Sequence, residues 1–282
     1  MNKIINKLLY LGPKGSYSES VIDKFSSYLD DNCVYEPIDS IYNIINTLNK
    51  SKTDTIGAII PIENSVEGIV RESQDSLTKI VSQGFRITAE RALCIEHCLI
   101  GFCQKEDTKT IKSHPQALAQ CRDYINKLNS SISLEPVLST SNAVKSINKD
   151  DPNIVAIGSE RCANLYNIPI IEKFINDEKN NTTRFILLTK TKPTKSEHNK
   201  VSIVFSTENK SGALNKILSI IERYNLNMTY IDSRPSRKEL GDYIFYIDFI
   251  GHTEDNNVYN ALIEIQAHVK FFEILSEGAN YV

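Results

Sequence analysis

The sequence predicts an α/β protein with two parts, an N-terminal unit of two lobes and a smaller C-terminal domain. Short apolar strands alternate with helical patterns from residue 7 onward, and this alternation starts again near residue 80. A polar stretch at 190–200 then precedes a shorter series of elements. The length of 282 residues also suits two domains.

The first series has the β-α-β-α-β order typical of a mostly parallel sheet. Ser16 and Glu19 form a capping box, which sets the start of the first helix. A polar loop is expected after the last strand. The expected elements are strand 7–12, helix 17–29, strand 33–37, helix 41–49 and strand 55–60.

The second series predicts another small α/β lobe. We expect lobe 1 at about 1–80 plus 160–189, because the apolar strand 185–188 can return the chain to it, and lobe 2 at about 81–159. Two such lobes create a cleft, and ligands bind where the strands end. The expected elements of lobe 2 are a strand-rich segment 85–97, helix 115–128, strand 133–137, helix 141–148 and strand 154–157.

Residues 190–200 are polar, contain Pro193 and show no apolar period, so they are expected to form a linker. The domain after it, 201–282, shows the βαββαβ order of the ferredoxin-like arrangement. Its expected elements are strand 201–207, helix 212–224, strands 228–233 and 242–251, helix 258–267 and strand 269–275.

Charge and hydropathy exclude several classes of protein. The net charge is -3, without a basic block or an acidic tail, so neither a nucleic-acid nor a membrane surface is indicated. No apolar run approaches the roughly 20 residues of a membrane span. Residues 1–12 lack a long apolar core, so no signal peptide is expected and a cytoplasmic location is predicted.

Three cysteines and a histidine, Cys94, His97, Cys98 and Cys103, suggest a zinc site at first sight. The segment 92–100 is predicted to be a strand, in which Cys94 and Cys98 lie about 13 Å apart and His97 points to the other face. One metal ion cannot bridge these positions. We therefore expect no metal site, and reduced, mostly buried structural cysteines instead.

Four polar segments stand where strands should meet helices or loops, which makes them the candidates for binding a small molecule. They are Gly12-Pro-Lys-Gly-Ser-Tyr-Ser-Glu19, Pro61-Ile-Glu-Asn-Ser-Val-Glu-Gly-Ile-Val70, Ser113-His-Pro-Gln-Ala-Leu-Ala-Gln-Cys121 and Asn180-Asn-Thr-Thr-Arg-Phe185.

These four segments resemble, in order and spacing, the characteristic motifs of the prephenate dehydratase family. Segments 212–214 and 227–235 resemble the phenylalanine-binding motifs of its ACT domain. Departures are small, with Ser16, Tyr17 and Asp232 where Thr, Phe and Glu are usual. The resemblance is to the stand-alone dehydratase, a lyase. It implies a two-lobed, periplasmic-binding-protein-like catalytic unit at 1–189 and a ferredoxin-like ACT regulatory domain at 201–282.

The resemblance also implies the reaction, in which prephenate loses water and carbon dioxide to give phenylpyruvate in L-phenylalanine biosynthesis. Aromatisation supplies the driving force, so neither a metal nor another cofactor is expected. The protein must orient a dianion and help its hydroxyl leave.

The family implies that Thr183 is the catalytic residue, as a hydrogen-bond donor or relay at the departing hydroxyl. Arg184 is expected to bind a carboxylate through its planar fork, and the other expected substrate-binding residues are Asn64, Ser65, Ser16, His114, Gln116 and Thr140. Each has a structural alternative: a loop Thr bonding its own backbone, a surface salt bridge for Arg184, or caps of helices and turns. Ser159 is expected to start a helix, and Glu63 could supply a proton if buried.

The ACT resemblance implies phenylalanine as an allosteric inhibitor, bound where two domains pair in a homodimer or dimer of dimers. Gly212 would let the backbone approach the ligand, and the alternative is a turn glycine in a purely oligomerising domain. The implied site comprises Gly212, Ala213, Leu214, Asn227, Asp232, Ser233, Arg234 and Pro235. Two other functions stay open, namely arogenate dehydratase and a non-catalytic regulator that binds a small molecule.

Overall fold

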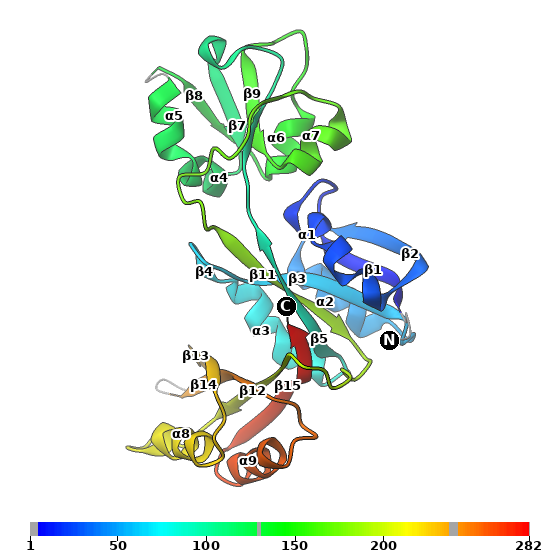
Figure 1. The fold of residues 1–282 in the computed structure, drawn as a ribbon, viewed down its shortest axis with the longest axis vertical. Coiled ribbons are helices and arrows are strands. Elements are labelled where there is room, and N and C mark those ends of the chain that lie inside the picture. Colours follow the sequence, from blue (N-terminus) through cyan, green and yellow to red (C-terminus); the bar gives the residue numbers. More distant parts are fainter. Residues whose placement is uncertain (1–4, 129–130, 237–241, 282) are drawn as a thin grey trace.

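A computed structural model describes residues 5–128, 131–236 and 242–281, which form two lobes and a C-terminal domain (Figure 1). Residues 1–4, part of the segment in which no signal peptide was expected, lie outside the described residues. No described helix is both long and apolar enough to cross a membrane. The predicted two-lobed α/β fold followed by a βαββαβ domain is confirmed.

Lobe 1 is built around β1, which pairs in parallel with β2 and β3. The predicted helix 17–29 is split, because only its first turn is α-helical and the rest is a 3-10 helix. The expected polar loop contains helix α3, whose buried face includes Leu77, Ile80 and Val81. The elements are β1 (Ile5–Leu11), α1 (Tyr17–Ser20), η1 (Ile22–Tyr28), β2 (Leu29–Ile38), α2 (Ile41–Lys50), β3 (Ile56–Asn64), β4 (Gly68–Ile69), α3 (Arg71–Val81) and β5 (Arg86–Cys94).

Lobe 2 has its own five-stranded sheet, in the order β10-β6-β9-β7-β8. Its elements are β6 (Cys98–Ile100), η2 (Lys105–Asp107), β7 (Thr110–Ser113), α4 (Pro115–Gln120), α5 (Arg122–Leu128), β8 (Ser133–Pro136), α6 (Thr140–Lys145), β9 (Ile154–Gly158), α7 (Glu160–Tyr166) and β10 (Ile170–Glu172). The described residues contain no group of three or more metal-ligating side chains close enough to hold a metal ion.

Both expected lobe boundaries are shifted. The expected lobe 2 was 81–159, but β5 pairs with β11 (Thr182–Thr189) in the sheet of lobe 1, and β10 pairs with β6 in lobe 2. The predicted strand 92–100 is therefore broken at 95–97, where the chain crosses between the two sheets. It returns through 173–181, so two crossing segments lie side by side between the lobes (Figure 1).

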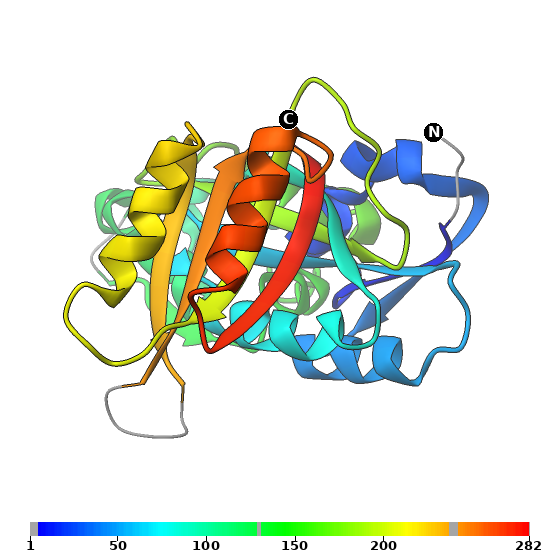
Figure 2. The same ribbon diagram turned by 90° about the horizontal axis from the view of Figure 1, so that it is seen from below.

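The C-terminal domain has the predicted βαββαβ order. Helices α8 and α9 lie side by side on one face of its sheet (Figure 2), and Ile217, Ile220 and Ile265 pack there against Phe205 and Phe249. The elements are β12 (Asn199–Ser206), α8 (Ala213–Arg223), β13 (Met228–Pro235), β14 (Tyr243–Ile250), α9 (Asn256–Gln266) and β15 (Phe271–Tyr281).

The C-terminal sheet is continuous with that of lobe 1, which the sequence did not predict. The end of β15 pairs in parallel with β5, giving a ten-stranded sheet. Val204, Tyr246 and Leu275 pack into the core of lobe 1. The expected linker has no helix or strand over 190–198, but Lys190 is paired with Asp54 of lobe 1. The C-terminal domain is therefore packed against lobe 1 and is not connected to it by a flexible linker alone.

Candidate active site

A cavity of about 390 Å³ lies between the two lobes, where the sequence predicted a cleft. The first crossing segment contributes Ile95 and His97 to the lining, and β11, which follows the second crossing, contributes Thr183 and Phe185. The structure brings six of the eight predicted catalytic and substrate-binding residues into the lining. These are Ser16, Asn64, His114, Gln116, Thr140 and Thr183.

Three helices begin at the cavity wall. Ser16 caps α1, because its Oγ accepts from the backbone N of Glu19 at 3.3 Å. His114 caps α4 by accepting from the N of Gln116 at 3.3 Å, and α6 begins at Thr140 after its cap, Ser139. The N-terminal turns present N–H groups and partial positive charge, which suits an anionic ligand.

The capping box of α1 is made with one change. Glu19 accepts from the backbone N of Gly15 instead of that of Ser16, whose own Oγ also donates to Leu11 O at 2.8 Å. Ser16 therefore has a structural role as well as a place in the cavity wall.

Thr183 and Asn64 face each other across the pairing of β11 with β3, and each is 8% exposed. The Oδ1 atom of Asn64 accepts from the backbone N–H groups of residues 66 and 67, both at 2.9 Å. Its Nδ2 therefore donates to Thr183 Oγ1 at 2.9 Å. Since this oxygen is already an acceptor, the hydroxyl hydrogen of Thr183 is free to donate into the cavity.

Two residues that were not predicted from the sequence extend this pair. Asn64 Nδ2 also donates to Asn181 Oδ1 at 2.7 Å, and Asn181 Nδ2 donates to Gln120 Oε1 at 3.0 Å. Both stand inside motif segments already identified. Gln120 is four residues after Gln116 on α4 and so lies on the same side of the helix, a spacing that could have indicated it.

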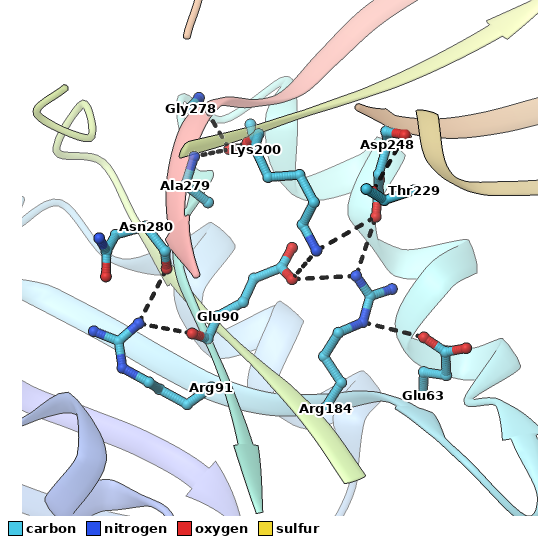
Figure 3. Close-up of polar contacts among 11 residues, drawn as sticks. Glu63, Glu90, Arg91, Arg184, Lys200, Thr229, Asp248, Gly278, Ala279 and Asn280 are labelled. Atoms are coloured by element: carbon cyan, nitrogen blue, oxygen red, sulfur yellow. Dashed lines mark hydrogen bonds and ion pairs between the residues drawn. The ribbon is translucent and has the colours of Figure 1, made fainter. Parts of the chain in front are cut away.

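Arg184 does not reach the cavity, so its predicted role in binding a substrate carboxylate is corrected. Neighbouring residues of a strand point to opposite faces, and Thr183 occupies the cavity side. Figure 3 shows the Arg184 guanidinium on the side of the C-terminal domain, with Nη1 3.1 Å from carboxylate oxygens of both Glu90 and Asp248. Its Nε lies 3.2 Å from Glu63, and Lys200 also contacts Glu90.

The charge of Arg184 is secured by these partners. Burial by itself lowers the pKa of the guanidinium, but Glu90, Asp248 and Glu63 outweigh it and raise that pKa above its ordinary value. Glu63 faces the same cluster, so the structure gives it a partner away from the cavity and not the role of a proton donor.

Ser65 and Ser159 also lie outside the cavity lining. Ser65 Oγ donates to Asn180 O at 3.1 Å and accepts from the N of Thr182 at 2.9 Å. It therefore holds the second crossing segment against the turn after β3. Ser159 caps α7 by accepting from the N of Cys162 at 3.1 Å.

The cavity lining carries no charged side chain. Within the described residues, its polar groups are hydroxyls, amides and the imidazoles of His97 and His114, and it includes no Asp, Glu, Lys or Arg. An anionic ligand must therefore be held by neutral donors and by the helix N-termini.

The implied regulatory residues are divided between two faces of β13, the edge strand of the ten-stranded sheet. Asp232 accepts from Gln74 Nε2 at 2.9 Å, and Arg234 pairs with Asp75 at 3.2 Å, so both face α3 of lobe 1. Ser233 and Pro235 are exposed.

The helical part of the implied regulatory site stands at one end of the C-terminal sheet. Gly212 precedes α8 with φ 80° and Ala213 and Leu214 form its first turn. Strands β12 and β13 both pair antiparallel with β14 and so run in the same direction. Residues 212–214 therefore lie at the same end of the sheet as Pro235, whereas Asn227 lies at the opposite end.

Comparison with known proteins agrees with this architecture. The prephenate dehydratase family model matches residues 8–193, and the ACT domain model matches residues 201–266. A prephenate dehydratase of Methanocaldococcus jannaschii is 41% identical over 98% of both chains. An arogenate dehydratase/prephenate dehydratase of Arabidopsis thaliana is 33% identical over 95% of this chain and 71% of its own.

A solved structure shows the same arrangement of all three parts. The prephenate dehydratase of Arthrobacter aurescens, solved in complex with L-Phe, is 27% identical, superposes with a TM-score of 0.85, and is matched over 97% of this chain and 89% of its own. The order of motifs, the cavity that gathers them and these matches lead to one conclusion: the chain belongs to the prephenate dehydratase family.

Proposed function

We propose that the chain is a prephenate dehydratase, which converts prephenate to phenylpyruvate, carbon dioxide and water and is inhibited by phenylalanine. Residues 1–189 would form the catalytic unit and 201–282 the regulatory domain. The observation that carries the proposal is the hydroxyl of Thr183, which Asn64 orients toward an uncharged cavity between the lobes. We also propose a cytoplasmic location, because all six cysteines of the chain are free thiols, as expected in a reducing compartment.

The chemistry asks little of the protein beyond orientation and one hydrogen bond. The C–O bond of the ring breaks, its electron pair leaves with the oxygen, and this oxygen takes a proton, supplied overall by the solvent, to become water. The C–C bond to the ring carboxylate breaks as well, and its electron pair completes the aromatic ring. A donor such as Thr183 stabilises the charge that develops on the departing oxygen.

The lining also bears on the choice between prephenate and arogenate. Arogenate carries an ammonium group where prephenate carries a keto group, and the described lining offers that ammonium no carboxylate. Leaving a desolvated charge unpaired is costly. We therefore expect kcat/KM for prephenate to exceed that for arogenate by at least about tenfold.

Parallel assays with the two substrates test this, with phenylpyruvate and phenylalanine as the measured products. Faster turnover of arogenate would reverse the assignment of substrate. Turnover of neither substrate would leave a binding protein and contradict the proposed function.

Two sets of contacts connect the regulatory domain with the catalytic strands. Asp248 of β14 pairs with Arg184, the neighbour of Thr183. Gln74 and Asp75 of α3 contact β13, and α3 follows the turn that is fixed by Asn64. A ligand that moves β13 would therefore disturb both sides of the Asn64–Thr183 pair, and a coupling of about 1–3 kcal/mol would be ordinary.

Gly212 provides a test of the phenylalanine site. We expect Gly212→Ala to abolish or strongly weaken phenylalanine binding, because an added methyl group blocks the approach of the ligand to the backbone. Gly84→Ala is a matched control, since Gly84 has φ 86° against 80° and neither position has an atom within 4 Å of an added Cβ. Both variants should lose about 1–2 kcal/mol of stability through the positive φ alone. Calorimetric titration with phenylalanine checks the difference, and equal affinities would remove Gly212 from the site.

We also propose a homodimer or a dimer of dimers, in which paired regulatory domains complete the phenylalanine sites. Support comes from β13, an edge strand with the exposed apolar residues Met228 and Ile231. Light scattering after size exclusion would measure the mass, and a monomer at micromolar concentration would contradict this proposal.

A further inference from the structure

His97 is a buried ionisable residue to which the chemistry above gives no task. It lies on the first crossing segment, lines the cavity and is 2% exposed. Its Nδ1 is 2.8 Å from the hydroxyl of Tyr17 in lobe 1, and its Nε2 is 3.0 Å from Gln120 Oε1 in lobe 2. The imidazole therefore bridges the two lobes at the cavity wall.

The hydrogen bonds that reach His97 have a fixed direction, which begins at the backbone. An N–H group can only donate, so residues 66–67 make Oδ1 of Asn64 an acceptor and leave its Nδ2 to donate to Asn181. Asn181 then donates from its own amide nitrogen to Gln120. Gln120 presents an oxygen to His97, and Nε2 of His97 must therefore carry a hydrogen.

The main chain holds the ring in place for this contact. The backbone N of His97 donates to Asn176 Oδ1 at 2.6 Å, and its carbonyl oxygen accepts from the N of Ile175 at 3.1 Å. Both partners belong to the second crossing segment, which leads directly to Asn181 and Thr183. The two crossings are thus joined at His97 by their backbones and by the chain of amides.

We propose that His97 is a positioning residue for the dehydration, whose Nε2–H fixes Gln120 and, through Asn181 and Asn64, the direction of the Thr183 hydroxyl. This inference rests on the function proposed for the cavity. The hydrogen on Nε2 is present both in the imidazolium ion, whose Nδ1–H would donate to Tyr17 while Tyr17 donates to Glu96 O, and in the neutral ring, whose Nδ1 accepts the single hydroxyl hydrogen of Tyr17. Burial lowers the pKa of His97, against a smaller opposing effect of the bond with Gln120, and so favours the neutral ring.

Two substitutions separate the Nε2–H from the bulk of the ring. His97→Leu removes the donor, and we expect kcat to fall by about 10²-fold with KM changed less than about threefold, because the catalytic hydroxyl loses its orientation. His97→Gln places an amide N–H near the position of Nε2, and its kcat should be at least about tenfold higher than that of His97→Leu. His268→Leu, at an exposed histidine of the C-terminal domain, is the matched control and should keep wild-type kcat. Equal losses in the Leu and Gln variants, with equal melting temperatures, would overturn the proposal.

A double-mutant cycle with Thr183→Ala tests whether His97 acts through Thr183. If it does, the double variant His97→Leu/Thr183→Ala should be no more than about threefold slower than Thr183→Ala alone, so the effects are far from additive. Additive losses in kcat would show that His97 acts independently and would contradict the inference. If the wild-type enzyme turns over prephenate and the losses are additive, only the role of His97 is contradicted. If the wild-type enzyme does not turn over prephenate, the proposed function is contradicted as well.

A spectroscopic measurement on the wild-type protein tests the position of the hydrogen directly and uses a variant only for assignment. The ¹⁵N chemical shifts of the ring nitrogens in histidine-labelled protein identify the protonated nitrogen, and comparison with His97→Gln assigns the signal of His97. We expect Nε2 to be protonated. A neutral ring protonated on Nδ1 alone would break the direction of the network and overturn the proposal.

Discussion

Thr183→Ala is expected to lower kcat by roughly 10²–10⁴ while KM changes little. The hydroxyl contributes mainly when charge develops on the departing oxygen, so its loss affects the transition state more than substrate binding. The variant should stay folded, because Asn64 keeps its bonds to Asn181 and to the turn 66–67. Steady-state kinetics with prephenate and thermal unfolding measure the two effects.

Two controls sharpen this experiment. Thr183→Ser keeps an oxygen that can accept from Asn64 and an O–H that can donate, so its kcat should stay within about tenfold of wild type. Thr182→Ala removes the neighbouring hydroxyl, which bonds Asn180 O and lies outside the cavity lining, and should leave kcat unchanged. If Thr183→Ala itself retained near wild-type kcat, Thr183 would have no part in the mechanism.

Arg184→Met is expected to cost about 3–5 kcal/mol of the free energy of unfolding. The substitution leaves Glu90 and Asp248, whose side chains are 4% and 10% exposed, with Lys200 as their remaining cation. A buried carboxylate without full compensation is costly, and these residues join β5 and β11 to the C-terminal domain. Urea unfolding, followed by far-ultraviolet circular dichroism, measures the loss.

An exposed arginine of the same domain provides the control. Arg223 pairs with Glu264 at 2.8 Å, but its side chain is 59% exposed, so Arg223→Met should cost less than about 1 kcal/mol. If Arg184→Met lost as little free energy of unfolding as Arg223→Met, the cluster around Arg184 would contribute no more than an exposed ion pair.

The KM for prephenate separates the two roles considered for Arg184. The structure predicts little change in KM for the folded fraction, whereas a large increase would restore the role of carboxylate ligand.

The same cluster changes the expectation for a truncated protein. From the sequence alone, a chain ending near Lys190 should keep some turnover if it folds and lose its response to phenylalanine. In the structure this truncation removes Asp248 from Arg184 and Lys200 from Glu90, and it strips β15 from β5. Loss of regulation in such a chain would therefore be confounded with loss of stability, so Gly212→Ala is the better experiment.

The local pattern was sufficient for much of the molecule. Alternating strands and helices gave the two lobes and the βαββαβ domain because each element buries an apolar face with its own period. Polar segments at the ends of strands indicated the cavity, since strand ends of one sheet meet at a common edge. Helix α3 was missed because most of its residues are polar, and three of these, Ser73, Gln74 and Ser76, are buried and form hydrogen bonds.

The contacts of each strand and helix face were decided by the tertiary structure. The sequence identified Thr183 and Arg184 as neighbours in one motif but not that a strand sends them to opposite sides. Arg184 meets Glu90 and Asp248, which are 94 and 64 residues away along the chain. The network from His97 to Thr183 likewise joins both crossing segments with α4. Such partners cannot be predicted from local periodicity. The periodicity shows which face of an element a side chain occupies, whereas the contacts of that side chain depend on where distant segments pack.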